Sequence, residues 1–130
     1  METITTNGVK ISVEVAYQAQ AKELADNEPR NIFAYRVTIQ NLNSFDVQLL
    51  RRHWHITNGL GVHREVKGPG VIGEQPVMHP HGSHRYVSYC PLVTDIGKMY
   101  GTFLMKNLKD GSYFEVDIPK FLMLLPQKEN

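Results

Sequence analysis

The sequence predicts an all-β protein, an immunoglobulin- or fibronectin III-like antiparallel sandwich of about seven or eight strands. Short segments that alternate apolar and polar residues recur along the chain, and turn-forming residues separate them. The strand–helix–strand alternation of a parallel sheet is missing. With 130 residues, 42% hydrophobic and 21% charged, the chain has the size and composition of one globular domain over residues 1–130.

The first elements show the alternation most clearly. Apolar residues occupy every second position in two segments, as in half-buried strands: Val9, Ile11, Val13 and Val15, then Phe33, Tyr35, Val37 and Ile39. Between these segments, Ala21, Leu24 and Ala25 have helical spacing, and Pro29 would end such an element. The pattern therefore predicts a helical turn within residues 18–27.

The rest of the chain supplies five further extended segments, over residues 47–57, 61–66, 84–90, 100–108 and 113–118. Turn signals lie between them, at Asn58-Gly59, Pro80 with Gly82, Pro91, and Asp110-Gly111. The last pair is typical of a hairpin, because both residues tolerate the positive φ that tight hairpin turns need.

Charge and cysteine content narrow the function classes. Lys plus Arg total 14 and Asp plus Glu total 13, so a net charge of +1 gives no overall field for nucleic acid or an anionic membrane. Cys90 is the only cysteine, which rules out an intramolecular disulfide and a cysteine-based zinc site. The start of the chain shows no secretory pattern, and the apolar run 121–125 is too short for a bilayer. We expect a cytoplasmic protein without nucleic-acid or membrane partners.

The segment GPGVIG, Gly68 to Gly73, matches the G-x-G-x-x-G pattern of dinucleotide-binding loops. That pattern works when it follows a buried parallel strand and opens a helix. Here the preceding strand is polar and alternating, and Pro76 and Pro80 prevent a helix of useful length. We therefore predict an irregular loop rather than a nucleotide site of this class.

Two interpretations of this loop remain. Its glycines relieve steric strain at a sheet edge, which we favour, or its backbone N–H groups from Gly70 to Gly73 hold an anion. The candidate anion-binding residues are Arg64, Lys67, Gly68, Gly70 and Gly73. Under the favoured interpretation pyrophosphate and nucleotides bind weakly, and Gly70→Ala damages folding more than ligand affinity.

Histidines and nucleophiles give no predicted active site. The turn HPHGSH holds His79, His81 and His84, and alternation places His53 and His55 on one strand face, a geometry that a metal can use. Neither set has a carboxylate or cysteine at a convincing spacing, so no metal or cofactor is expected. Ser88 and Cys90 are close in sequence to His84, but neighbours along a strand rarely form a base-activated nucleophile. We expect no enzymatic activity.

Arg52 shares strand parity with Leu50, Trp54 and Ile56, which points it inward unless a bulge intervenes. We favour a structural arginine whose stem is buried and whose guanidinium pairs with a carboxylate. The alternative is bidentate binding of an anionic partner.

A series of motifs resembles the ApaG family: FAYRVTIQN (33–41), VQLLRRHWHITN (47–58), VKGPGVIGEQPV (66–77), YVSYCPLVT (86–94), GKMYGTF (97–103) and FEVDIPKF (114–121). The resemblance implies an immunoglobulin- or fibronectin III-like sandwich. ApaG-like domains at the ends of some F-box and DNA-polymerase-interacting proteins are regarded as protein-binding modules. The bacterial family is linked genetically to cobalt and magnesium tolerance, and no enzymatic activity is established for it.

These observations together favour a non-catalytic binding module with an unidentified protein partner, acting as a monomer or weak homo-oligomer. Two alternatives stay open. One is weak binding of an anion, pyrophosphate or nucleotide at GPGVIG, and the other is a role in divalent-metal tolerance.

Overall fold

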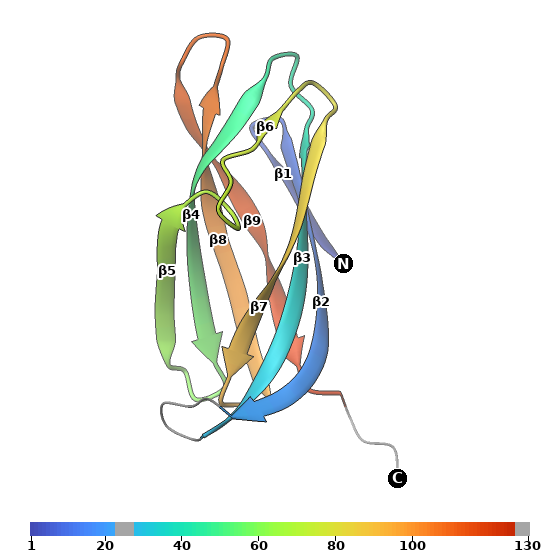
Figure 1. The fold of residues 1–130 in the computed structure, drawn as a ribbon, viewed down its shortest axis with the longest axis vertical. Coiled ribbons are helices and arrows are strands. Elements are labelled where there is room, and N and C mark those ends of the chain that lie inside the picture. Colours follow the sequence, from blue (N-terminus) through green and yellow to red (C-terminus); the bar gives the residue numbers. More distant parts are fainter. Residues whose placement is uncertain (23–27, 127–130) are drawn as a thin grey trace.

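The computed structural model describes residues 1–22 and 28–126, which form nine strands and no helix. The strands are β1 (Glu2–Thr6), β2 (Val9–Lys22), β3 (Pro29–Asn41), β4 (Val47–Asn58), β5 (His63–Pro69), β6 (Val77–Met78), β7 (Ser83–Leu92), β8 (Ile96–Asn107) and β9 (Tyr113–Leu124). Two antiparallel sheets face each other (Figure 1). Sheet A has the order β1-β2-β3-β7, and sheet B has the order β5-β4-β8-β9 with β6 beside β4. The predicted all-β sandwich is confirmed.

The alternation of apolar residues determines which side of each strand faces the core. In β3 the four residues Phe33, Tyr35, Val37 and Ile39 are all buried, and the residues between them are half-buried. Sheet B contributes the opposite wall of the core through β4, β8 and β9, including Trp54, Met99, Phe103, Met105, Val116, Ile118, Phe121 and Met123. Burial of one face per strand therefore builds a single core between the sheets.

The predicted helical turn over residues 18–27 is wrong for its described part. Residues 18–22 continue β2, which passes a bulge between Tyr17 and Ala19 and pairs with β3 as far as Lys22 opposite Pro29. A single helical turn is costly to nucleate, whereas pairing with β3 satisfies the backbone directly. Residues 23–27 lie outside the described part of the chain.

Two strands go beyond those that the sequence pattern predicts. β1 is almost entirely exposed and has no apolar face, so it lacks the periodic signal. β6 is two residues long and pairs only with Val47 and Gln48. Neither segment carries enough alternation to predict a strand, because β1 has no buried face and β6 has only two residues, of which Met78 is buried. None of the described segments is a helix with the length and apolarity needed to cross a bilayer.

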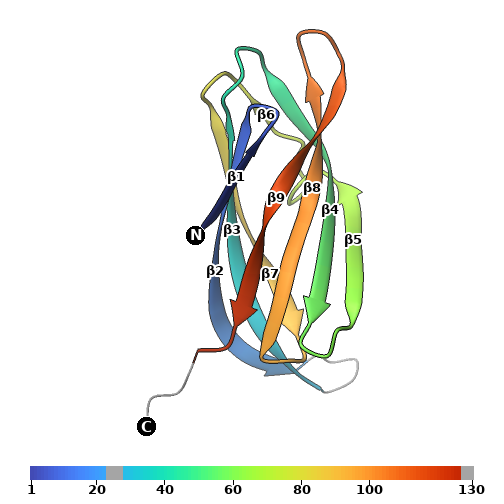
Figure 2. The ribbon, with the colours of Figure 1, turned by 180° about the vertical axis from the view of Figure 1, so that it is seen from behind.

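One side of the sandwich is closed by β1 and β9, which lie next to each other (Figure 2). The side chain of Asn7 donates to the carbonyl of Glu115 at 2.9 Å, and the backbone N–H of Asp117 donates to Thr6 Oγ1 at 3.3 Å. On the other side, the edge strands β5 and β7 belong to different sheets. This second side is where the candidate site lies.

A bulge in β4 sets the direction of its side chains. Leu49 pairs with Met105 and Arg51 with Leu104, so Leu50 is an extra residue relative to β8. The carbonyl of Leu50 instead accepts hydrogen bonds from Gly70 N–H at 2.8 Å and from the side-chain amide of Gln75 at 3.0 Å. The bulge thereby holds the GPGVIG loop against β4.

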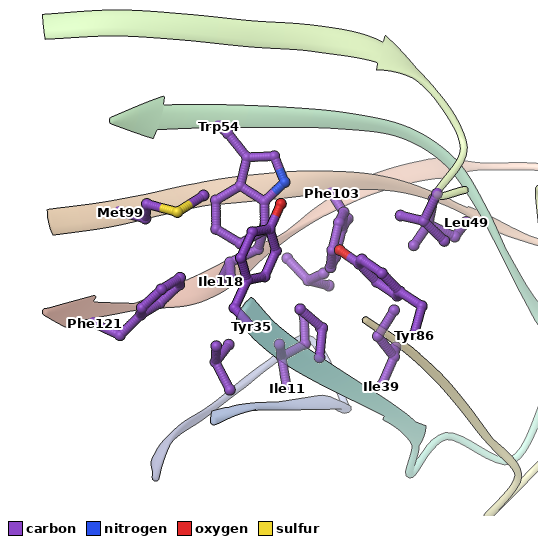
Figure 3. Close-up of a cluster of buried hydrophobic side chains, with 14 of the residues drawn as sticks. Ile11, Tyr35, Ile39, Leu49, Trp54, Tyr86, Met99, Phe103, Ile118 and Phe121 are labelled. Atoms are coloured by element: carbon purple, nitrogen blue, oxygen red, sulfur yellow. The ribbon is translucent and has the colours of Figure 1, made fainter. Parts of the chain in front are cut away.

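An aromatic cluster fills the centre of the core (Figure 3). The Trp54 ring from sheet B lies 5.4 Å from the Tyr35 ring of sheet A, measured between centroids, in an edge-to-face arrangement. It also meets Phe121 at 6.0 Å and Phe103 at 6.4 Å, almost perpendicular in both cases. Such pairs add to the burial energy of the rings, so Trp54 joins the two sheets.

Replacing Tyr86 with Phe is expected to raise the free energy of unfolding by about 1 kcal/mol. The Tyr86 hydroxyl is buried without a hydrogen-bond partner among the described residues, and burial raises its pKa. An unsatisfied buried hydroxyl loses its hydration on folding and gains nothing in return. Urea denaturation measures the change. Tyr35→Phe is the control, because it removes a hydroxyl that bonds to Ser88, and it is expected to lower stability. A comparable loss in Tyr86→Phe would contradict the prediction.

Candidate functional site

A cleft of about 170 Å³ opens between the edge strands β5 and β7. Its polar groups come from both sheets: Arg52 from β4, Arg64 from β5, Tyr35 from β3, and Ser88 and Cys90 from β7. The floor is apolar and includes Trp54 and Met99. Polar groups converging above an apolar floor are typical of a binding site.

Arg52 points inward, as its parity predicts, but it does not meet the expected carboxylate. Its Nη1 donates to the carbonyl oxygens of Pro69 at 2.9 Å and Gly70 at 3.1 Å. Gly68 makes room for this arrangement, because a Cβ there would lie 2.9 Å from Arg52 Nη1. Arg52 bonds to backbone carbonyls rather than to a carboxylate because the end of β5 and the loop after it fold over the β4 bulge. This turns the two carbonyls toward the guanidinium.

Arg64 reaches across the opening from β5 to β7. Its Nη2 donates to the carbonyl of Pro91 at 3.3 Å and contacts Cys90 Sγ at 3.6 Å. Burial raises the pKa of the Cys90 thiol, and nearby Arg64 only partly offsets this. Burial likewise raises the pKa of Tyr35, against the effect of its hydrogen bond to Ser88. The Cys90 thiol and the Tyr35 hydroxyl are therefore neutral at pH 7, and within the described part of the chain Arg52 and Arg64 are the only charged side chains that line the cleft.

The five candidate anion-binding residues do not form one site. Arg64 lies on the cleft side of β5, whereas exposed Lys67 lies opposite His53 on the outer face of sheet B. Gly68 is covered by Arg52, and the N–H of Gly70 is bonded to Leu50. Of the three glycines, Gly68 and Gly70 are buried and Gly73 is exposed to solvent.

The predicted irregular loop at GPGVIG is wrong, although no helix follows it: Gly68 and Pro69 end β5, and the segment then forms a tight hairpin. Val71 and Glu74 exchange both backbone hydrogen bonds, at 2.8 and 3.0 Å. The two residues between them, Ile72 and Gly73, have φ of 47° and 73°, as in a type I′ turn. The N–H of Val71 is therefore engaged, like that of Gly70. The predicted donor set from Gly70 to Gly73 is reduced to the N–H groups of Ile72 and Gly73.

Two of the three histidines of HPHGSH, His79 and His84, turn to separate partners. His79 Nδ1 lies 3.0 Å from Asp46, and His84 Nε2 lies 3.8 Å from Glu74. Within the described ranges, no hydrogen bond joins a histidine to Ser88 or Cys90. The geometry thus shows no base-activated nucleophile at the cleft.

The pair His53 and His55 has a carboxylate beside it, contrary to the expectation from spacing. The β4–β5 hairpin places Glu65 opposite His55, and Glu65 Oε1 lies 3.3 Å from His53 Nε2. The hydrogen bond from His53 is the main reason that the pKa of the Glu65 carboxyl is lowered. The turn signal at Asn58-Gly59 already indicated a hairpin, and pairing the flanking residues across it would have brought Glu65 to this position.

With this geometry established, comparison with known proteins decides the family. The ApaG domain model matches residues 21–107, which is more than half of the chain. The chain belongs to the ApaG family. It is 43% identical to Protein ApaG of Brucella suis biovar 1 over 128 residues, covering 98% of this chain and 96% of that relative.

Two solved structures share the fold. The ApaA protein of Bordetella pertussis is 38% identical, with a TM-score of 0.82 over 92% of this chain and 95% of that chain. An X-ray structure of a structural genomics target is 34% identical, with a TM-score of 0.86 over 92% of this chain and 89% of that chain. These matches confirm the resemblance of the sequence motifs to ApaG. None of the names of these relatives specifies a reaction.

Proposed function

We propose that this ApaG-family protein is a non-catalytic binding module, and that its cleft between β5 and β7 holds an acidic side chain of an extended segment from a protein partner. One observation carries the proposal. Arg52 and Arg64 both line the cleft, and neither forms an ion pair with a carboxylate among the described residues.

The charge of the cleft favours a carboxylate. A guanidinium partly removed from water is best compensated by an anion, and here each one contacts only neutral groups. The two hydrogen bonds that Arg52 donates to Pro69 and Gly70 use Nη1, and the two contacts of Arg64 with Cys90 and Pro91 use Nη2. The remaining N–H groups of both side chains are left to form charge-assisted bonds with an incoming carboxylate.

The size of the cleft favours a side chain over a nucleotide. Its volume of about 170 Å³ is smaller than the roughly 300–1,000 Å³ of ordinary small-molecule pockets. A single carboxylate side chain needs less space than a base, ribose and phosphates together. The rest of the ligand would therefore lie outside the cleft, on the surface around it.

That surface has the composition of a protein interface. β7 is an edge strand, and its Tyr89 borders the cleft with 61% of its surface exposed. Val87 on the same strand and Val93 just after it are about half exposed. Exposed tyrosine beside arginine is enriched at the energetic centres of protein interfaces. An unpaired strand edge also accepts an extended peptide as an additional strand.

The chemistry of Cys90 favours binding over nucleophilic catalysis at the cleft. The only thiol, Cys90, has a raised pKa, and its contact is with Arg64 rather than a base. A thiol needs a lowered pKa or an adjacent base to act as a nucleophile at neutral pH.

Binding of a fluorescein-labelled peptide with alternating Val and Glu residues tests the proposal by anisotropy. Arg64→Ala is expected to weaken binding roughly 10- to 100-fold, as for loss of a charge-assisted hydrogen bond. Arg85→Ala is the matched control. Arg85 is also an exposed arginine, but it lies on β7 outside the cleft, and its loss should change affinity less than about twofold.

Two outcomes would contradict the proposal. Equal losses in Arg64→Ala and Arg85→Ala would indicate only non-specific charge attraction. Saturable amide shifts centred on residues 68–73 with pyrophosphate, and none in β7 with the peptide, would favour the anion-binding alternative.

A further inference from the structure

The outer face of sheet B carries a group of side chains that the cleft does not use. His53 and His55 project from β4, and His63 and Glu65 project from β5. We propose that these four residues, here named the His/Glu cluster, bind one divalent transition-metal ion of the zinc class.

The distances between the ligand atoms carry the proposal. Glu65 Oε1 lies 3.3 Å from His53 Nε2 and 3.4 Å from His55 Nδ1, and one ligand atom from each of these three residues lies within 4.8 Å of the other two. In a tetrahedral site with Zn–N bonds of about 2.0–2.1 Å, neighbouring ligand atoms are about 3.3 Å apart. Two edges of the cluster already have this length, so an ion needs little rearrangement of these side chains.

His63 provides the fourth ligand. Its Nε2 lies 3.2 Å from His55 Nδ1, and its Nδ1 lies 3.0 Å from Thr57 Oγ1. When Nδ1–H donates to the Thr57 hydroxyl, the lone pair of His63 Nε2 faces His55. Such an outer hydrogen bond is the usual way in which a metal-binding imidazole is oriented. Two imidazole nitrogens at this distance need a proton or a shared cation between them.

The scaffold holds the ligands before an ion arrives. All four residues lie on one antiparallel hairpin, whose register is set by continuous pairing from Arg51 opposite Pro69 to Thr57 opposite His63. The His55 ring stacks on Tyr100 of β8, with centroids 4.9 Å apart and planes 10° apart. Sites built on paired strands with a packed second layer keep their geometry better than sites on loops.

The ligand chemistry selects the class of ion. Imidazole nitrogens suit Zn²⁺, Ni²⁺ and Cu²⁺, whereas Mg²⁺ and Ca²⁺ prefer oxygen ligands throughout. The His53 and His55 side chains are 32% and 25% exposed, so an ion can enter from solvent. The cluster lies on the opposite side of β5 from Arg64, so metal binding is separate from the proposed cleft function.

Calorimetric titration of the full chain with Zn²⁺ tests the site. We expect saturable binding of one equivalent, and we expect His55→Ala and Glu65→Gln to weaken it at least roughly 10- to 100-fold, the cost of losing even an outer-shell partner. His79→Ala is the matched control, because His79 is an exposed histidine with its own carboxylate partner, Asp46. It should leave affinity within about twofold. Equal melting temperatures of the metal-free variants show that the loss is not one of folding.

Imidazole nitrogen spectra identify the ligand atoms directly. On adding Zn²⁺, we expect shifts of His53 Nε2, His55 Nδ1 and His63 Nε2, with His79 and His84 unchanged. The proposal is overturned if no saturable binding occurs, or if binding survives His55→Ala and is lost in His79→Ala. In either case the His/Glu cluster is a hydrogen-bonded network without a metal.

Discussion

Gly70→Ala is expected to lower the free energy of unfolding by about 2–5 kcal/mol, while Gly73→Ala in the same hairpin should cost only about 1 kcal/mol. Both glycines have positive φ, 61° and 73°, so an alanine at either position meets the same backbone strain. The two positions differ in what a Cβ would touch.

A Cβ at Gly70 would lie 2.1 Å from the carbonyl oxygen of Glu74, whereas a Cβ at Gly73 would have no atom within 4 Å. The Glu74 carbonyl cannot move away freely, because it accepts the N–H of Val71 at 2.8 Å. Relief of the clash would open the hairpin and pull Gly70 N–H from the Leu50 carbonyl at the β4 bulge. Steric overlap with backbone, rather than φ alone, therefore makes Gly70 the sensitive position.

Urea denaturation of the two variants, followed by tryptophan fluorescence, measures the difference. Trp54 is the only tryptophan and lies in the core, so its emission reports global unfolding. Equal destabilisation by the two substitutions would contradict the steric account. It would leave the positive φ as the sole reason for glycine in this loop.

Trp54→Ala is expected to cost about 3–5 kcal/mol of stability, the range for large aromatic truncations in a core. The ring is 2% exposed and contacts three aromatic rings, those of Tyr35, Phe103 and Phe121. Its removal leaves a cavity between the sheets that strands on both sides cannot close without shifting their registers. Far-UV circular dichroism during urea denaturation is the measurement, since this variant has no tryptophan.

Tyr89→Ala is the matched control for Trp54→Ala. Tyr89 is also an aromatic residue in the middle of a strand, but most of its surface is exposed, so truncation should change stability by less than about 0.5 kcal/mol. A loss above 2 kcal/mol in Tyr89→Ala would show that the surface around the cleft is part of the core. Under the proposed function, the same variant should bind the acidic peptide more weakly while remaining folded.

Alternation along the chain was sufficient to predict most of the architecture. Inward positions such as Val37 and Ile39 are buried as their spacing predicts, and the Asp110-Gly111 turn joins β8 to β9 with a positive φ at Gly111. β1 and the end of β2 were missed or misassigned. The residues of these two segments are exposed. They are held in place by pairing with a neighbouring strand and not by burial of an apolar face.

The candidate site likewise was predicted from the sequence only in part. The inward direction of Arg52 follows from its parity with Trp54 and Ile56. Its carbonyl partners, Pro69 and Gly70, lie seventeen and eighteen residues further along the chain, in a segment that folds onto the β4 bulge. The carboxylate beside His53 follows from hairpin register, which depends on turn length as well as on pattern.

By itself, the sequence determined the fold class, the buried face of most strands and, through its motifs, membership of the ApaG family. These depend on local periodicity and on a series of motifs in a given order and at given separations, both of which are present in the linear chain. Only the tertiary structure decided that Arg52, Arg64 and Cys90 from three strands meet in one cleft, and that the His/Glu cluster forms on the opposite face of β5. The cleft and the cluster depend on which strand edges face each other and on the extra residue in β4. The alternation of apolar and polar residues along a strand carries no information about the strand arrangement or the bulge.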